Sequence, residues 1–386
     1  MRTSELRAPA VVTAPAVSTT PPVVRYLLDR GLLDVKSIVE GDLVVLDATR
    51  RNRNIKVFRS DGPSYLVKQG IDADGRATVA HEAAVYDLRA RTSEKRGIAR
   101  HLPRVFEFEP ETGTLVLELF DRASDLRAYH ARLARFPVSV GADLGRGLAH
   151  MHRIPLGVGG SGSVADPEGP MVGPAWTLFI HRPPLRRFWD MSAASIALTR
   201  IVQQFDQLCA QLDDLIAGWR VETLVHNDLK AENCVVLARK RGRGRIKIVD
   251  WEFAGPGDPY WDVGSVFGSY LSSWLYSVPI LGAEFDDRSL ALAGLPLERM
   301  QPAIRSFWFS YVSERGIGVD EVGTALLRAV RYSGARLLQT AYEQTQSSQQ
   351  LNGNVVGILQ LAANVMARPW EACGGLLGIP LPAVVR

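Results

Sequence analysis

The chain has 386 residues, of which 46% are apolar and 22% are charged. These values exclude a disordered or a fibrous protein, and the length predicts two lobes or domains rather than one compact core. No run of about 18 apolar residues is present, so we expect no membrane span. The net charge of +4 is compatible with acidic ligands but is too small to identify a partner.

The start of the chain and its cysteines indicate a compartment. No apolar core follows Arg2 and Arg7, so the N-terminus lacks the pattern of a secretory signal. Residues 1–22 are rich in Pro, Thr and Ala and predict a disordered tail. The three cysteines show no paired spacing, which is typical of a reducing environment. We therefore expect a cytoplasmic protein.

Residues 23–120 predict a small lobe built mainly from strands. A short helix begins at Pro22 and ends at Gly31. One longer helix, from about Thr78 to Arg91, lies among the strands. Short apolar runs separated by turn residues give the expected strands Leu43–Leu46, Ile55–Phe58, Tyr65–Val67, Val105–Glu109 and Leu115–Leu119.

Residues 121–386 predict a larger, mainly helical lobe. A strand-rich lobe followed by helices is an α+β pattern with a small antiparallel sheet. Short strands interrupt the helices at residues 224–264, where the chemistry-bearing residues lie. Helical periodicity covers about 124–135, 139–152, 185–219 and most of the chain after 258, and a Gly- and Pro-rich loop covers 155–175.

Two neighbouring segments carry oxygen-bearing side chains at the ends of short apolar runs. Asp228 is followed five residues later by Asn233, and Asp250 follows the run Ile246–Val249. Phosphoryl transfer requires a base for the acceptor proton and oxygen ligands for Mg²⁺. These three residues supply such groups in order, although each taken singly could be a surface residue in a turn.

The motif resembles a known family. His226-Asn-Asp-x-x-x-x-Asn, then Ile-Val-Asp-Trp-Glu, then the segment Gly257–Gly264 resembles the aminoglycoside phosphotransferase and choline kinase superfamily, which has the bilobal protein-kinase-like fold. The resemblance implies that Asp228 is the catalytic base and that Asn233 and Asp250 are Mg²⁺ ligands. It also implies that His226 braces the loop and that Asp262 anchors it.

The same resemblance implies an ATP site in the small lobe. Only seven of the 45 basic residues are lysines, and Lys68 ends an apolar strand, where it is expected to bind the α- and β-phosphates. Glu82, in the next helix, is its expected partner. The backbone around Glu118, Leu119 and Phe120 resembles the hinge that binds adenine.

Two features depart from the family or leave alternatives open. The loop between the first two strands, residues 49–54, has no glycine to cover the phosphates, and its three arginines could neutralise phosphate or could simply face water. Lys230 resembles a protein-kinase lysine that neutralises the γ-phosphate during catalysis. An exposed loop lysine is an equal alternative.

The expected acceptor is a hydroxyl group on a small molecule or on a peptide Ser/Thr, as in peptide-modifying kinases that work with a partner enzyme of a biosynthetic pathway. Residues 176–190 are aromatic and basic, which favours a neutral, acidic or peptide acceptor over a polycation. A catalytically weak, kinase-like binding module is the alternative function. The basic run 239–245 is interpreted as a solvated hairpin turn, so we expect no nucleic-acid partner.

Overall fold

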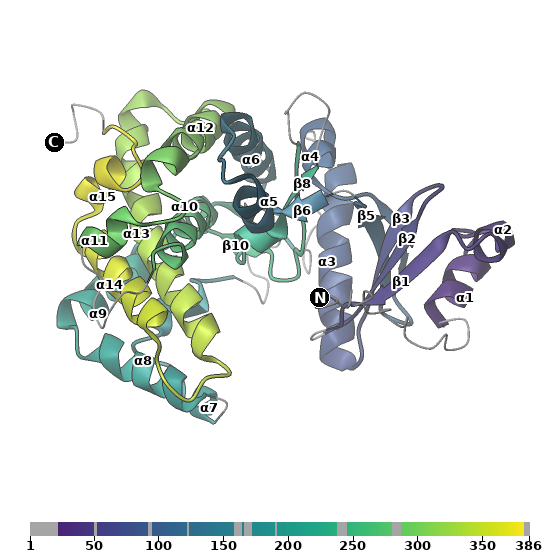
Figure 1. The fold of residues 1–386 in the computed structure, drawn as a ribbon, viewed down its shortest axis with the longest axis horizontal. Coiled ribbons are helices and arrows are strands. Elements are labelled where there is room, and N and C mark those ends of the chain that lie inside the picture. Colours follow the sequence, from purple (N-terminus) through teal and green to yellow (C-terminus); the bar gives the residue numbers. More distant parts are fainter. Residues whose placement is uncertain are drawn as a thin grey trace, which may run out of the picture.

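The computed structural model describes residues 22–49, 52–91, 95–121, 123–157, 164–165, 172–189, 191–237, 245–279 and 287–381. In this part of the chain, a small sheet lobe is followed by a larger helical lobe, and helix α3 (Ala73–Arg91) stands between the sheet and the helices (Figure 1). The predicted α+β class and bilobal kinase-like architecture are therefore confirmed. The predicted tail lies outside the described residues, except for Pro22.

The small lobe is a five-stranded antiparallel sheet of order β1-β2-β3-β5-β4. Because side chains alternate along a strand, its two faces bury different residues. Val67 packs against helix α1 (Pro22–Asp29) on one face, whereas Leu66 and Lys68 belong to the face that α3 covers. The strands are β1 (Leu43–Asp47), β2 (Arg53–Arg59), β3 (Ser64–Gln69), β4 (Val105–Glu109) and β5 (Thr114–Leu119).

Three helical details of this lobe differ from the prediction. Helix α3 begins at Ala73 rather than at Thr78, because Asp72 Oδ1 accepts a hydrogen bond from Gly75 N at 2.7 Å and caps an earlier turn. The sequence analysis also missed the short helices α2 (Val35–Val39) and α4 (Lys95–His101). Five- and seven-residue helices carry too little periodicity to be recognised.

The helical lobe contains two small sheets among its helices. Its first part comprises β6 (Ala123–Asp125), α5 (Leu126–Leu133), α6 (Val138–Met151), η1 (Trp176–Phe179), α7 (Leu185–Phe188), α8 (Ala193–Gln203) and α9 (Asp206–Ala217). The middle part comprises β7 (Thr223–Val225), η2 (Ala231–Asn233), β8 (Cys234–Leu237), β9 (Arg245–Ile248) and β10 (Gly255–Gly257). The last part comprises α10 (Pro259–Tyr276), α11 (Asp287–Ala291), α12 (Leu297–Arg315), α13 (Val319–Thr345), α14 (Gly353–Ala367) and α15 (Pro369–Gly375).

Close helix packing positions the long helix α13 over the middle segment. Gly264 of α10 lies so near α13 that a Cβ atom there would be 2.6 Å from Ala329 O. Gly268, one turn further along α10, allows Arg336 of α13 to lie across it, with the Arg336 Cγ atom 3.3 Å from the position of a Cβ. Helix α13 therefore brings Arg336 to Asp228, in the segment 224–264.

Three other predictions concern the whole chain. No described helix is long and apolar enough to cross a lipid bilayer. All three cysteines lie in the described part and are free thiols: Cys209, Cys234 and Cys373. Most of the basic run 239–245 lies outside the described residues, but β8 and β9 on either side pair antiparallel, with Leu237 opposite Arg245.

Candidate active site

A buried carboxylate holds the predicted catalytic loop. Asp262, at the start of α10, is fully buried and accepts hydrogen bonds from His226 N (2.7 Å) and Asn227 N (3.1 Å). His226 is also fully buried, and its Nε2 contacts Val249 O at 3.0 Å. The loop is thereby tied both to α10 and to the segment that carries Asp250.

His152, at the end of α6, completes this anchor. Burial lowers the pKa of His152, more than the neighbouring Asp262 carboxylate raises it. In the neutral ring, Nε2–H donates to Asp262 Oδ2 (3.1 Å), while Nδ1 accepts from the Tyr311 hydroxyl (2.9 Å). The sequence analysis assigned no contact to this histidine.

Cations face both oxygens of Asp228. Lys230 Nζ donates to Asp228 Oδ2 at 2.7 Å, and Arg336 Nη2 lies 3.2 Å from Oδ1. The Asn233 side-chain amide donates to the Asp228 carbonyl oxygen at 2.9 Å. Lys230 therefore lies beside the predicted base rather than pointing into solvent.

Asn233 and Asp250 lie on neighbouring backbone segments. Val249 N donates to Asn233 O at 2.9 Å, which places the following residue, Asp250, beside Asn233. Asp250 has a left-handed backbone with φ 69°, and Asn227 has φ 65°. Asx residues tolerate this conformation better than other non-glycine residues do.

The residues fit Mg²⁺ by the chemistry of their donors. The Asn233 Nδ2 atom makes a hydrogen bond, so its amide oxygen remains as a ligand for a metal. Asp250 Oδ1 accepts a hydrogen bond from Lys68, so Asp250 Oδ2 remains as a second metal ligand. Mg²⁺ prefers oxygen and needs only one or two protein carboxylates when nucleotide phosphates and water complete its shell. Among the described residues, no cluster of three or more His, Cys, Asp or Glu side chains is suited to a metal.

Lys68 connects the two lobes. Its Nζ lies 2.7 Å from Glu82 Oε2 on α3 and 2.6 Å from Asp250 Oδ1 in the helical lobe. Burial lowers the pKa of Lys68, but the two carboxylates outweigh it and raise this pKa above its ordinary value. For Asp250, burial alone would raise the pKa. The interaction with Lys68 outweighs burial, and the pKa of Asp250 lies below its ordinary value. Both groups are therefore charged at neutral pH.

Helix α3 makes a second contact with the helical lobe. His81, next to Glu82, approaches Ala254 O through Nε2 at 2.6 Å. Burial lowers the pKa of His81, so the neutral ring donates its Nε2–H to this carbonyl. The Tyr86 hydroxyl donates to the other Glu82 oxygen at 3.0 Å, which fixes the carboxylate that faces Lys68.

The predicted hinge follows β5. Glu118 N donates to Arg104 O at 2.8 Å, and the Glu118 carboxylate accepts from Arg104 N at 3.0 Å. The N–H group of Glu118 is thus used by the small lobe itself. The adenine contact remains a prediction for the backbone of Glu118, Leu119 and Phe120 other than this N–H group.

The glycine-free loop is only partly described. Arg50 and Arg51 lie outside the described residues, so their expected contact with phosphate stays a prediction. Asn52 is 6% exposed, and its Oδ1 lies near Gly75 of α3 without a hydrogen-bond partner among the described residues. This part of the loop packs on α3.

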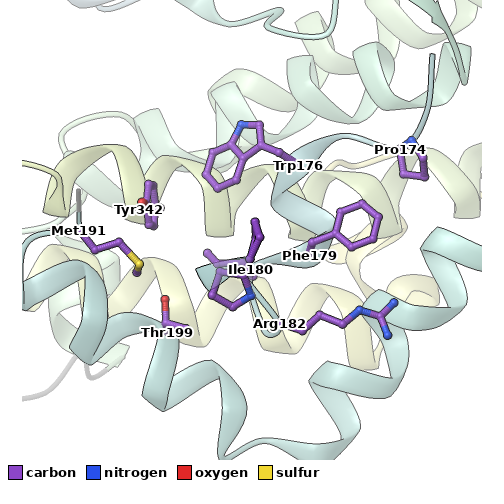
Figure 2. Close-up of a pocket in the computed structure, with 10 residues that line it drawn as sticks. Pro174, Trp176, Phe179, Ile180, Arg182, Met191, Thr199 and Tyr342 are labelled. Atoms are coloured by element: carbon purple, nitrogen blue, oxygen red, sulfur yellow. The ribbon is translucent and has the colours of Figure 1, made fainter. Parts of the chain in front are cut away.

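An open cavity of about 460 Å³ lies beside the predicted acceptor segment. Trp176 and Phe179 of η1 and Tyr342 of α13 surround it (Figure 2). Trp176 packs edge-on against Tyr342, with their ring centroids 5.1 Å apart. No acidic residue lines this cavity in the described part of the chain, and Arg182 contributes a cation that is paired with Asp213 at 2.7 Å.

The sequence analysis did not identify Arg336. Its side chain is 3% exposed, and its two ends face Asp228 and Glu343. The available signal was a charged residue at a buried position of a helix, within the run Gly334-Ala-Arg-Leu-Leu338. A buried arginine requires partners, which would have marked the position for attention.

Comparisons with solved structures find related folds. A choline kinase from Cryptosporidium parvum Iowa II has 11% identity and a TM-score of 0.53, covering 92% of this chain and 98% of that one. The streptomycin–ATP–APH(2")-IIa ternary complex has 12% identity and a TM-score of 0.50, covering 91% and 99%. The amicoumacin kinase hAmiN in complex with AMP-PNP, Ca²⁺ and Ami has 13% identity and a TM-score of 0.50, covering 92% and 98%. At these identities the likeness shows a shared fold.

Sequence comparisons give one match. The model of a family described as the phosphotransferase enzyme family matches residues 42–303, which include every residue that the sequence analysis assigned to the site. A comparison with curated proteins finds no match.

Proposed function

The chain belongs to the phosphotransferase enzyme family, and we propose that it transfers the γ-phosphoryl group of ATP to a hydroxyl group with the help of Mg²⁺. The observation that carries the proposal is the convergence of Lys68, Asp228, Asn233 and Asp250 from two lobes into one site. Phosphoryl transfer depends on positioning and on charge stabilisation rather than on covalent chemistry. The arrangement supplies both.

Each residue has a defined part in this proposal. Lys68 binds the α- and β-phosphates, and the Asn233 amide oxygen and the Asp250 carboxylate hold Mg²⁺. When bound, Mg²⁺ neutralises the charge of the phosphates and orients them. Asp228 orients the acceptor hydroxyl and accepts its proton on the carboxylate. Lys230, on Asp228 Oδ2, stabilises the negative charge on the transferring group.

The acceptor is a small molecule or a peptide Ser/Thr. The aromatic cavity of Trp176, Phe179 and Tyr342 supports an acceptor with an apolar part, and the absence of acidic residues in its described lining argues against a polycation. A peptide acceptor would imply a partner enzyme that uses the phosphorylated side chain.

The test is phosphoryl transfer by the purified chain. ADP release and the phosphorylated product are measured with Mg·ATP and a panel of alcohols and Ser/Thr peptides. Asp250→Ala should abolish transfer while the circular dichroism spectrum is kept, because a metal ligand is lost. Asp320→Ala, an exposed position on α13, is the control. Turnover of Asp250→Ala within about threefold of the wild type would remove Asp250 from the metal site.

The glycine-free loop favours a second candidate, a binding module with weak catalysis. Calorimetry with Mg·ATP and an assay of ADP release together separate the two functions. A module would bind nucleotide and release no ADP with any acceptor, whereas an enzyme would bind nucleotide and release ADP with its acceptor.

A further inference from the structure

Arg336 occupies an unusual place beside the proposed base. Its guanidinium approaches Asp228 Oδ1 through Nη2 (3.2 Å) and Glu343 Oε1 through Nη1 (3.6 Å). Although the side chain is 3% exposed, Nη1 makes no hydrogen bond within the described part of the chain, because Glu343 Oε1 lies beyond hydrogen-bond distance. A buried N–H group without a partner is costly, so this geometry is one that a substrate oxygen would complete.

Arg336 lies on the acceptor side of Asp228. Lys68 and the proposed metal ligands approach the site from the small lobe and from the β8–β9 hairpin. Arg336 comes instead from α13, the helix that carries Tyr342 of the aromatic cavity six residues, or about 9 Å, further along. Gln339, between them, accepts from the Thr177 hydroxyl at 2.8 Å and donates to Glu343 at 2.9 Å. One polar strip of α13 thus leads from the base toward the cavity.

The charges around Arg336 cancel. Asp228 and Glu343 contribute two negative charges, and Lys230 and Arg336 itself contribute two positive charges. A cationic acceptor would find no surplus carboxylate among these four described residues and would meet a buried guanidinium close to its hydroxyl. Like charges placed together at a desolvated contact strongly disfavour binding.

We propose that Arg336 is a specificity-determining residue that rejects acceptors with a positive charge close to the reacting hydroxyl. Its free N–H group binds an uncharged or anionic oxygen of the acceptor, such as a carbonyl or a carboxylate. This inference rests on the proposed phosphotransferase function and adds the charge class of the acceptor.

The test uses acceptors that match in shape and differ in charge. Choline is compared with 3,3-dimethylbutan-1-ol, and N-acetyl-seryl-lysinamide with N-acetyl-seryl-norleucinamide, by measuring kcat/KM for product formation with saturating Mg·ATP. In the wild type, each neutral probe should exceed its cationic match by about tenfold or more. Equal values, a preference for the cationic probes, or no transfer to either neutral probe would overturn the inference.

Variants assign the preference to Arg336. Arg336→Met should reduce the neutral-to-cationic ratio at least about fivefold, whereas Arg336→Lys should keep it because the charge remains. Arg331→Met, an exposed position on the same helix, is the matched control and should keep the wild-type ratio. A uniform loss of kcat with an unchanged ratio in Arg336→Met would make Arg336 a positioning residue only and overturn the inference.

The outcomes separate the inference from the function on which it rests. If Arg336→Met does not fold by circular dichroism, the wild-type ratios and Arg336→Lys decide. The proposed function fails when the wild type consumes no Mg·ATP with any acceptor or with water. The inference alone fails when ATP is consumed and the cationic probes are preferred.

Discussion

Lys68 Nζ and Asp250 Oδ1 lie 2.6 Å apart, across 182 residues of sequence and across the junction of the two lobes. Glu82 lies on the other side of the same ammonium group, at 2.7 Å. One buried cation therefore holds a carboxylate from each lobe. The stability of the fold and the assembly of the proposed nucleotide site therefore depend on the same atom.

Lys68→Met should reduce both activity and stability. Glu82 is 1% exposed, and without Lys68 its carboxylate would be buried with only the Tyr86 hydroxyl as a side-chain partner among the described residues, which costs about 3 kcal/mol of unfolding free energy. Adding Glu82→Gln should restore most of that stability but none of the turnover. Urea unfolding and ADP release measure the two effects. A double variant that regained activity would show that Lys68 does not bind phosphate.

Asp228→Asn should lower turnover by about 10²–10⁴, the range for loss of a positioned general base. The affinity for Mg·ATP should change little, because Asp228 approaches neither Lys68 nor the Asp250 carboxylate in the described contacts. Steady-state kinetics and calorimetry test the two halves of this prediction. An equal loss of nucleotide binding would mean that Asp228 acts on the metal instead.

Lys230→Met should lower turnover by about 10²-fold while ATP binding is kept, because its ammonium group, 2.7 Å from Asp228 Oδ2, is preorganised for the charge of the transition state. Lys230→Arg keeps the charge but has a longer, planar head, and we expect poor rescue. Lys36→Met, whose side chain is 75% exposed, is a control for general charge effects. Turnover of Lys230→Met close to that of the wild type would show that Lys230 is an ordinary loop lysine without a part in catalysis.

Acid should destabilise the protein through buried histidines. Burial lowers the pKa of His130 to about 4, and no hydrogen-bond partner for its Nε2 lies in the described part of the chain. Because the folded pKa lies below the unfolded value of about 6.5, the unfolded chain takes up a proton first as the pH falls. The contribution is fully present above about pH 6.5 and falls by about 3 kcal/mol as the pH drops to about 4.

His130→Phe isolates this contribution, since the ring packs among Tyr129, Phe136 and Tyr270. Between pH 7.5 and 5.0 the wild type should lose about 2 kcal/mol more unfolding free energy than the variant. Urea titrations at the two pH values give the comparison. Equal losses would show that His130 is not held neutral in the fold.

The strands and long helices could be predicted because their patterns are local. All five strands of the small lobe, and α6 to within a residue or so, follow from short apolar runs and helical periodicity. Asp228, Asn233 and Asp250 were assigned to the site from a loop motif that fixes their spacing, and the structure brings them together. The Lys68–Glu82 pair was found from the family resemblance and is present in the structure.

What could not be predicted depends on contacts between distant segments. Arg336 reaches Asp228 only because glycines of α10 allow α13 to pack closely, and no local pattern encodes that approach. His81 contacts Ala254 O over 173 residues. The β1–β2 loop lacks the glycines that related kinases carry. It packs on α3 through Asn52, near Gly75, and this contact forms only in the folded chain.

The left-handed backbones of Asn227 and Asp250 have a consequence for how this protein can change. Each residue occupies a conformation that glycine adopts freely and that costs another residue about 1 kcal/mol or more. Glycine at position 227 would relieve this strain and lose only the exposed hydrogen bond from the Asn227 Nδ2 atom to Phe253 O (2.9 Å). Glycine at position 250 would also take a carboxylate away from the buried Lys68, which costs about 3 kcal/mol and outweighs the relief. Laboratory evolution toward heat resistance alone should therefore accept glycine at position 227 and keep Asp250.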